Sequence, residues 1–325
     1  MWPKNIKEML KTVYRMKRDG HAGRASKEKL VCRRLYFVKS YYVSPCLTFF
    51  FNSAIMNIME QWNAVDYHMN SSEQQKWGLE LLDKIALSGN ERVLDVGCGD
   101  GKLTAEIVRR VPYGSVLGID KSEDMIRFAQ EHYQSDVFPN LKFVLLDARN
   151  LFFDQEFDVV FSNAALHWVD DHANILLKIR GSLSAGGRVI AQMGGKGNAS
   201  GILKILDTMI SSKKWAGYFK GFSVPYTFYD DQEYRILLGS AGLTVKRIEL
   251  IAKQMIHNGR GGLAAWIRTT WLPYTRQLPE NLQTGFINEI VNAYIKVQAL
   301  HGSGIIPVEM VRLEFEAERA VIGDQ

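Results

Sequence analysis

Three glycines at alternate positions, with one acidic residue before them and another between the last two, form the part of this sequence best suited to chemistry. The run is Arg92-Val93-Leu94-Asp95-Val96-Gly97-Cys98-Gly99-Asp100-Gly101. Glycine lets a backbone turn sharply and approach a ligand closely, because it has no Cβ atom. The apolar residues before Gly97 predict a buried strand, and residues 102–110 predict a helix whose first N–H groups face the turn. The run therefore predicts a cofactor-binding turn in a doubly wound sheet.

The spacing of these glycines argues against a dinucleotide. A dinucleotide fingerprint has a third glycine five residues after the first, and this chain has Lys102 there. Asp95 and Asp100 would repel a pyrophosphate, whereas they would attract a ligand with a cationic amino-acid end. The alternative from the residues alone is a glycine turn that binds no cofactor.

The motif Val-Leu-Asp-Val-Gly-Cys-Gly-Asp-Gly at 93–101 resembles the first motif of the class I S-adenosylmethionine-dependent methyltransferases. The resemblance implies S-adenosylmethionine as cofactor, S-adenosylhomocysteine as product, and no metal. It also implies a seven-stranded, mostly parallel Rossmann-like α/β sheet with an antiparallel edge strand. The motif residues expected at the cofactor are Asp95, Gly97, Cys98, Gly99, Asp100 and Gly101.

Two further strands end in carboxylates. Residues 115–120 end in Asp120, where the ribose of a cofactor needs an acceptor, and residues 141–147 end in Asp147, which in the family meets the adenine amino group. Asp120 could instead be a turn or cap residue, and Asp147 a turn residue. The remaining positions expected at the cofactor are Lys121, Ala148 and Asn163.

The fourth strand, 157–163, runs into Leu166-His167-Trp168. Ligands in open α/β sheets bind beyond the carboxyl ends of the strands, so these side chains are expected at the substrate crevice. The tripeptide resembles the trans-aconitate methyltransferase group, which includes juvenile-hormone-acid and malonyl-carrier-protein carboxyl methyltransferases. The resemblance implies that His167 orients the substrate, and that Trp168 and Gln74 shape its pocket. His167 could instead bond the backbone, and Trp168 could be a core residue.

An upstream helix and a late insertion are expected to close the site. The helix opens near Ser71 and reaches about residue 85, and Tyr67 before it is a candidate for closing the pocket. Strands are predicted at 188–193, 242–250 and 310–317, and a helical lid at about 259–302 lies between the last two. In that lid Trp266, Arg268 and Arg276 are candidates for holding a carboxylate, because arginine binds carboxylates with a planar fork. Both arginines could instead be solvated helix-face charges.

The net charge of +5 is unevenly distributed. Residues 1–55 carry twelve Lys and Arg against three acidic residues, a net charge of +9, which leaves −4 for the methyltransferase domain at 56–325. An acidic body argues against nucleic-acid binding. The first 55 residues are interpreted either as an extension upstream of the true start or as a basic arm that contacts membranes. Three cysteines without metal spacing favour a cytoplasmic protein.

These features predict a methyltransferase that O-methylates a carboxylate of a small organic acid. Such an acceptor is already anionic at neutral pH, so no general base is required. Two alternatives stay open at this point. One is C- or O-methylation of a quinone- or phenol-like acceptor, for which His167 would be the base. The other is a non-catalytic protein that binds S-adenosylmethionine as a partner subunit.

Overall fold

The computed structural model describes residues 64–298 and 304–320. The predicted extension at 1–55 lies outside these residues. Within them, seven strands form one sheet: β1 (Arg92–Val96), β2 (Ser115–Asp120), β3 (Leu141–Leu145), β4 (Phe157–Asn163), β5 (Leu183–Gly194), β6 (Leu243–Asn258) and β7 (Ile305–Arg319). No helix in this part of the chain is long and apolar enough to cross a bilayer.

The sheet confirms the predicted Rossmann-like class. Its strand order is β3-β2-β1-β4-β5-β7-β6, and all pairs from β3 to β5 are parallel. The antiparallel strand is β7, which lies one place in from the edge, between β5 and the edge strand β6. Strands β1 and β2 are buried almost throughout, as expected for parallel strands covered on both faces. The carboxyl ends of β1, β2 and β4 therefore meet at one end of the sheet.

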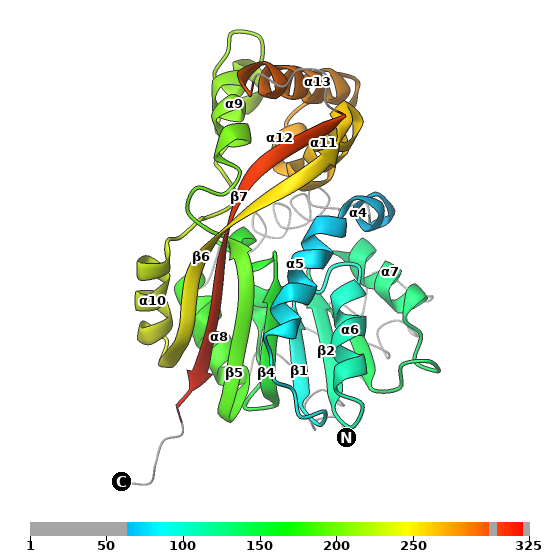
Figure 1. Cartoon of the computed structure of the whole chain (residues 1–325), viewed down its shortest axis with the longest axis vertical. Helices are drawn as coiled ribbons and strands as arrows, with labels where there is room; N and C mark the ends of the chain where they lie inside the picture. Colours follow the sequence, from blue (N-terminus) through cyan, green and yellow to red (C-terminus); the bar gives the residue numbers. More distant parts are fainter. Residues whose placement is uncertain (1–63, 299–303, 321–325) are drawn as a thin grey trace, which may run out of the picture. The chain divides into compact units, whose positions relative to one another are not determined.

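Helices cover both faces of the sheet (Figure 1). They are α4 (Ala64–Asn70), α5 (Ser72–Asp83), α6 (Lys102–Arg110), α7 (Glu123–His132), α8 (His172–Ser182), α9 (Ser200–Ile210), α10 (Asp231–Ser240), α11 (Gly259–Thr270), α12 (Leu272–Thr275) and α13 (Glu280–Val297), with short 3₁₀ turns η1 (Ala148–Asn150), η2 (Leu166–Trp168) and η3 (Ala216–Phe219). Helices α5 and α6 pack on one face, and α8 and α10 pack on the other.

The hairpin of β6 and β7 is longer than the sequence predicts. The sequence places the strands at 242–250 and 310–317, but they run over 243–258 and 305–319 and pair to their far ends. The extension includes polar residues such as Lys253, Gln254 and Asn258, which a hairpin that extends past its sheet can carry on its solvated face. The extension carries the chain into the helical part (Figure 1).

Helices α11, α12 and α13 follow β6 and pack with α9 and η3 around an apolar core of their own. Trp215, Trp266, Phe286 and Tyr294 are among its buried side chains, and Ile306 from the first half of β7 also belongs to it. Helix α9 comes from the segment after β5, and Trp77 of α5 also belongs to this core, so the core is built from several separate stretches of sequence. The sequence pattern alone indicates only the stretch at 259–302.

Candidate functional site

The glycine turn forms as predicted between β1 and α6. Gly97, Gly99 and Gly101 have φ angles of +76°, +54° and +83°, which only glycine adopts readily. The Gly97 and Cys98 N–H groups donate to the Ile119 carbonyl over 2.8 and 2.9 Å, which ties the turn to the end of β2. A Cβ atom added at Gly99 would meet no atom within 4 Å. The backbone at Gly99 is therefore open to a ligand.

Two of the predicted carboxylates lie on either side of this turn. Asp95 is buried and accepts a hydrogen bond of 2.7 Å from the Thr104 hydroxyl. Burial raises the pKa of Asp95 to about 7, against the lowering by Thr104, and the charge of Asp120 raises it further. Asp100 accepts a hydrogen bond of 2.8 Å from His68 Nδ1 and lies 3.4 Å from Lys102 Nζ. A cation bound at the turn would favour ionised Asp95.

Asp120, at the end of β2, faces the turn. Its two oxygens accept hydrogen bonds from the Ser122 N–H (2.8 Å) and the Gly99 N–H (3.1 Å). Each carboxylate oxygen can accept more than one hydrogen bond, so a ribose hydroxyl could still bind. Ser122 itself caps α7 through its hydroxyl, so a capping role does not account for Asp120.

Asp147 is differently engaged. Both its oxygens accept hydrogen bonds from Arg149, and it caps η1, where Ala148 is the first residue. Burial raises the pKa of Asp147, but the Arg149 bonds lower it by more, below its ordinary value. Lys121 is exposed. The adenine contacts expected of Asp147, Ala148 and Lys121 stay predictions.

A cavity of about 50 Å³ lies against the glycine turn. Gln74, Tyr67 and Asn163 line it together with Asp95, Asp100 and the glycines Gly97 and Gly99. Asn163 Nδ2 donates to the Gln74 carbonyl over 3.3 Å, so α5 is joined to the end of β4. Gln74 Oε1 and Asn163 Oδ1 are buried without a hydrogen-bond partner among the described residues. Two unsatisfied acceptors beside carboxylates fit a ligand that brings cationic N–H donors.

His167 and Trp168 lie beyond the end of β4, in η2. His167 is buried, and its Nδ1 accepts a hydrogen bond of 3.4 Å from the Gly194 N–H, which leaves Nε2 to carry the proton. Burial lowers the pKa of His167 well below its ordinary value, and the charges of Arg312 and His172 lower it further. The imidazole is therefore neutral near pH 7 and a weak base.

An aromatic segment lies against His167 and Trp168, and no pattern in the sequence predicts it there. The Phe228 ring lies 5.8 Å from the His167 ring, and the Tyr226 ring lies 5.8 Å from Trp168. Tyr226 also contacts Trp271 of the helical insertion, at 5.6 Å between ring centroids. Nothing in the spacing of residues 222–229 marks them, because their position depends on tertiary packing.

The three insertion residues predicted to hold a carboxylate are spread out. Trp266 packs in the core against His257, and its indole nitrogen has no partner among the described residues. Arg268 forms two hydrogen bonds of 2.8 Å to Asp66 of α4. Arg276 lies at the end of α12. The structure does not bring these three together, and their substrate roles stay predictions.

Arg312 of β7 is the charged residue that sequence reasoning missed. It is 4 % exposed and lies in β7, where the sequence predicts only a strand near the edge of the sheet. Its signal in the sequence is a basic residue in an apolar strand, Met310-Val311-Arg312-Leu313, but strands with one solvated face show the same pattern.

The residues around the cavity fit the cofactor that the motif implies. S-adenosylmethionine has an ammonium and a carboxylate at one end and a ribose in the middle. Gln74 Oε1, Asn163 Oδ1 and Asp95 would hold the ammonium, and Asp120 would hold the ribose. The open backbone at Gly99 admits a group that a Cβ atom would exclude.

Comparison with known proteins bears on the same residues. A methyltransferase domain model matches residues 87–220, which contain the glycine turn and η2. An uncharacterised methyltransferase of Schizosaccharomyces pombe is 31% identical over 265 residues, covering 80% of this chain and 98% of the relative. A trans-aconitate 2-methyltransferase of Delftia acidovorans is 26% identical over 276 residues, covering 80% and 99%.

Among solved structures, phosphoethanolamine N-methyltransferase 2 of Haemonchus contortus, in complex with S-adenosyl-L-methionine, has the same fold. Its TM-score is 0.52 at 17% identity, over 79% of this chain and 56% of that one. The domain match and the relatives that this chain covers almost entirely agree with the cavity geometry. The chain therefore belongs to the S-adenosylmethionine-dependent methyltransferases.

Proposed function

We propose that this enzyme transfers the methyl group of S-adenosylmethionine to a carboxylate oxygen of a small organic acid such as trans-aconitate. The observation that carries the proposal is the state of His167, the imidazole nearest the end of β4. A phenol or carbon acid must lose a proton before or during methylation, which calls for a base with a pKa near the working pH. Burial leaves His167 well below that range.

A carboxylate acceptor removes the need for this base. Its ordinary pKa is about 4, so the acid enters the site ionised. S-adenosylmethionine supplies a methyl group on a positively charged sulfur. The carboxylate oxygen forms the new bond to carbon while the sulfur–carbon bond breaks, and the products are a methyl ester and S-adenosylhomocysteine. No proton is transferred, so the protein contributes by aligning the oxygen and excluding water.

The surroundings of η2 support this role. Trp168, Tyr226 and Phe228 form an aromatic cluster beside His167, and an acid bound against it would be shielded from water on that side. Relatives named trans-aconitate 2-methyltransferase, at 26–28% identity over most of their length, support the acid as acceptor. The same proposal includes a small-molecule acid as the partner, no nucleic acid, no metal and a cytoplasmic location.

The test uses labelled S-adenosylmethionine with trans-aconitate, citrate, dodecanoate, a catechol and a quinol. We expect label on an acid, released as methanol by mild alkali because esters hydrolyse. With S-adenosylmethionine saturating, kcat/KM for the acid should be flat between pH 6 and 9, and His167→Ala should not introduce or remove a titration. Alkali-stable product, or an apparent pKa near 6–7 that His167→Ala removes, would overturn the proposal.

A further inference from the structure

Arg312 is buried on the face of the sheet that α5 covers. Its Nε donates to Gln192 Oε1 over 3.3 Å, and its guanidinium carbon lies 5.6 Å from the centre of the Trp77 ring. Among the described residues, Nη1 and Nη2 make no hydrogen bond and Arg312 makes no ion pair. The outer fork of this guanidinium, the part that grips carboxylates, is thus unused by the protein.

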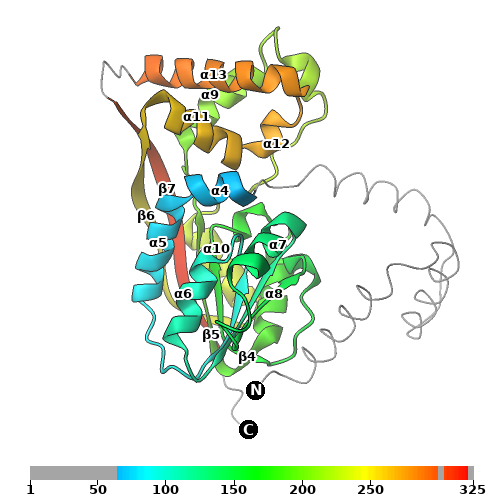
Figure 2. The same cartoon turned by 90° about the vertical axis from the view of Figure 1, so that its right-hand side faces the viewer.

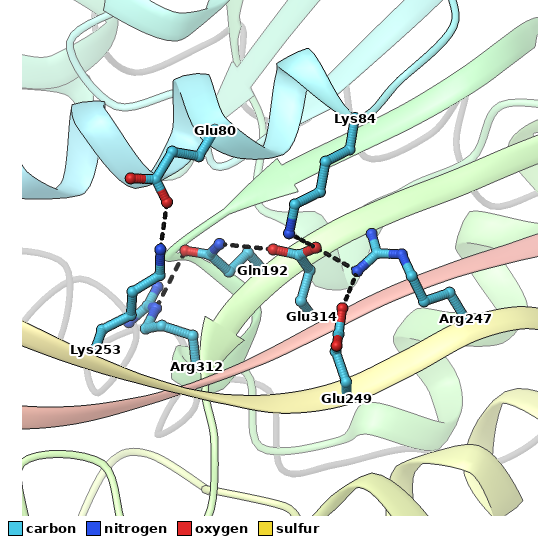
Figure 3. A network of polar contacts seen from close by, with 8 residues as sticks. All are labelled: Glu80, Lys84, Gln192, Arg247, Glu249, Lys253, Arg312 and Glu314. Atoms are coloured by element: carbon cyan, nitrogen blue, oxygen red, sulfur yellow. Dashed lines mark hydrogen bonds and ion pairs between the residues drawn. The ribbon is translucent and has the colours of Figure 1, made fainter.

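The neighbouring charges do not compensate Arg312. Figure 3 draws eight residues of this network, of which four are cations and three are carboxylates. Glu314 accepts hydrogen bonds from Lys84 over 2.7 Å and from Arg247, and each of the remaining carboxylates also pairs with a cation of the network. The pairs outside Glu314 are Arg247 with Glu249 and Lys253 with Glu80. One positive charge is left over among these residues, and it is that of Arg312.

Gln192 lies between Arg312 and the carboxylate of Glu314 and orients the Arg312 side chain. The Gln192 Nε2 donates to Glu314 Oε2 over 3.0 Å, which turns Oε1 toward Arg312. Burial lowers the pKa of Arg312 to about 10, so it keeps its charge near neutral pH. A buried, unpaired cation destabilises a fold, and a ligand that brings a negative charge removes this cost.

The charge of Arg312 acts on one residue of the cofactor cavity, Tyr67, and on one residue of η2, His167. Tyr67 lines the cavity, and its pKa is raised by burial and by the charges of Asp100 and Asp120. The charge of Arg312 lowers the same pKa, so the Tyr67 ring is within electrostatic range of the carboxylates at the turn and of Arg312. His167 is likewise within range of Arg312. In the sheet, Arg312 pairs with Gly194, whose N–H faces His167. An acid bound beside both Tyr67 and His167 would therefore lie within electrostatic range of Arg312.

The charge of Arg312 indicates which carboxylate it would bind. A carboxylate that accepts a methyl group loses its negative charge during the reaction. A cation on that group would stabilise the reactant more than the transition state and slow the step. A carboxylate that stays ionised throughout is stabilised equally before and after transfer, so Arg312 suits a group that is not methylated.

We propose that Arg312 is the substrate-positioning residue that binds a second, unmethylated carboxylate, and so selects di- and tricarboxylic acids over monocarboxylic acids. This inference rests on the proposed function. Gln192 and Trp77 hold the guanidinium, and its Nη1 and Nη2 atoms hold the acid.

The test compares trans-aconitate with the monocarboxylates crotonate and dodecanoate. The wild-type enzyme should prefer trans-aconitate, and Arg312→Met should raise its KM by about 30-fold or more without changing the affinity for S-adenosylhomocysteine. Arg312→Lys keeps the charge but loses the fork, and should raise KM by about tenfold. Lys253→Met is the matched control, because it removes a paired cation of the same network, and its KM should stay within about twofold of wild type.

The outcomes separate this inference from the proposed function. If the wild type methylates none of the acids, the proposed function fails and the role of Arg312 fails with it. If it methylates an acid but prefers monocarboxylates, or if both Arg312 variants keep the KM for trans-aconitate, the role of Arg312 alone is wrong. Should Arg312→Met lose S-adenosylhomocysteine binding through misfolding, Arg312→Lys decides.

Discussion

Gly97 and Gly99 stand two positions apart in the turn, yet a side chain would meet different surroundings at each. A Cβ atom at Gly97 would lie 2.2 Å from Ala165 Cβ, which is far inside van der Waals contact. A Cβ atom at Gly99 would meet nothing within 4 Å. The first glycine is therefore required by packing between the turn and the end of β4, whereas the second is expected to leave room for the ligand.

This difference predicts opposite responses to alanine. Gly99→Ala should weaken S-adenosylhomocysteine binding about tenfold or more, while left-handed strain lowers the free energy of unfolding by only about 1–2 kcal/mol. Gly97→Ala adds a steric clash to the same strain and should cost about 2–5 kcal/mol. Calorimetric binding and urea unfolding measure the two effects. Wild-type affinity in Gly99→Ala would contradict an open cradle at that residue.

Asp95 should make cofactor binding depend on pH. Its pKa is raised by burial to about 7, so the carboxyl is mostly protonated at pH 6 and mostly ionised at pH 8. Only the ionised form attracts the ammonium of the cofactor, so affinity for S-adenosylhomocysteine should rise up to about tenfold over this interval. For folding the sign is opposite: the raised pKa gives stability that is present below about pH 4 and lost as pH rises through about 7.

Titration calorimetry at pH 6, 7 and 8 checks this. Asp95→Asn should bind with an affinity that no longer varies, whereas Asp147→Asn should keep the wild-type dependence, because Arg149 holds the pKa of Asp147 below its ordinary value. A pH dependence that survives in Asp95→Asn would assign it to another group.

At the scale of elements, the short helix α4 connects the cofactor turn to the helical insertion. His68 bonds Asp100 and also accepts, through its carbonyl, a hydrogen bond from Lys102. At the other side, Asp66 receives both hydrogen bonds of Arg268 from α11. Figure 2 shows α4 lying between α11 and the part of the fold that carries α7. A change in the insertion can therefore reach the cofactor through α4.

Breaking the pair of Arg268 and Asp66 tests this connection. Arg268 is 51% exposed, so Arg268→Gln should change the free energy of unfolding by less than about 1 kcal/mol. If α4 responds, S-adenosylhomocysteine should dissociate a few-fold faster in stopped-flow measurements, and Asp66→Asn should give the same change. If Arg268 instead binds the substrate, as the sequence predicts, KM for the acid would rise in Arg268→Gln and stay constant in Asp66→Asn.

At the scale of the whole described molecule, the sequence predicts the sheet and the cofactor end well. Strands β1 to β4 are short, mostly apolar segments, and the turn between β1 and α6 is set by local glycine chemistry, so both follow from neighbouring residues. Asp120 is likewise found by its place at the end of β2. These features need little knowledge of tertiary structure.

The substrate end is harder to predict, for a physical reason. Arg312 is buried because Trp77 of α5 covers that face of β7, and the two residues are far apart in sequence. Arg268 is a residue type that binds carboxylates, yet its guanidinium already donates hydrogen bonds to Asp66. Which arginine is paired and which is not depends on long-range contacts, and no local pattern reports them.

Strand β7 serves two parts of the fold at once. Its second half crosses the sheet beside β5 and carries Arg312, whereas Ile306, Val308 and Met310 of its first half pack among the insertion helices. The insertion enters and leaves through the β6–β7 hairpin, so its helices can vary in sequence without altering the pairing of β5 with β7, provided that α9 and the Arg268–Asp66 pair keep their contacts. A graft of α11–α13 from a relative, joined at residues 258 and 305 and keeping the Arg268–Asp66 pair, therefore tests whether the insertion determines which acceptor is methylated.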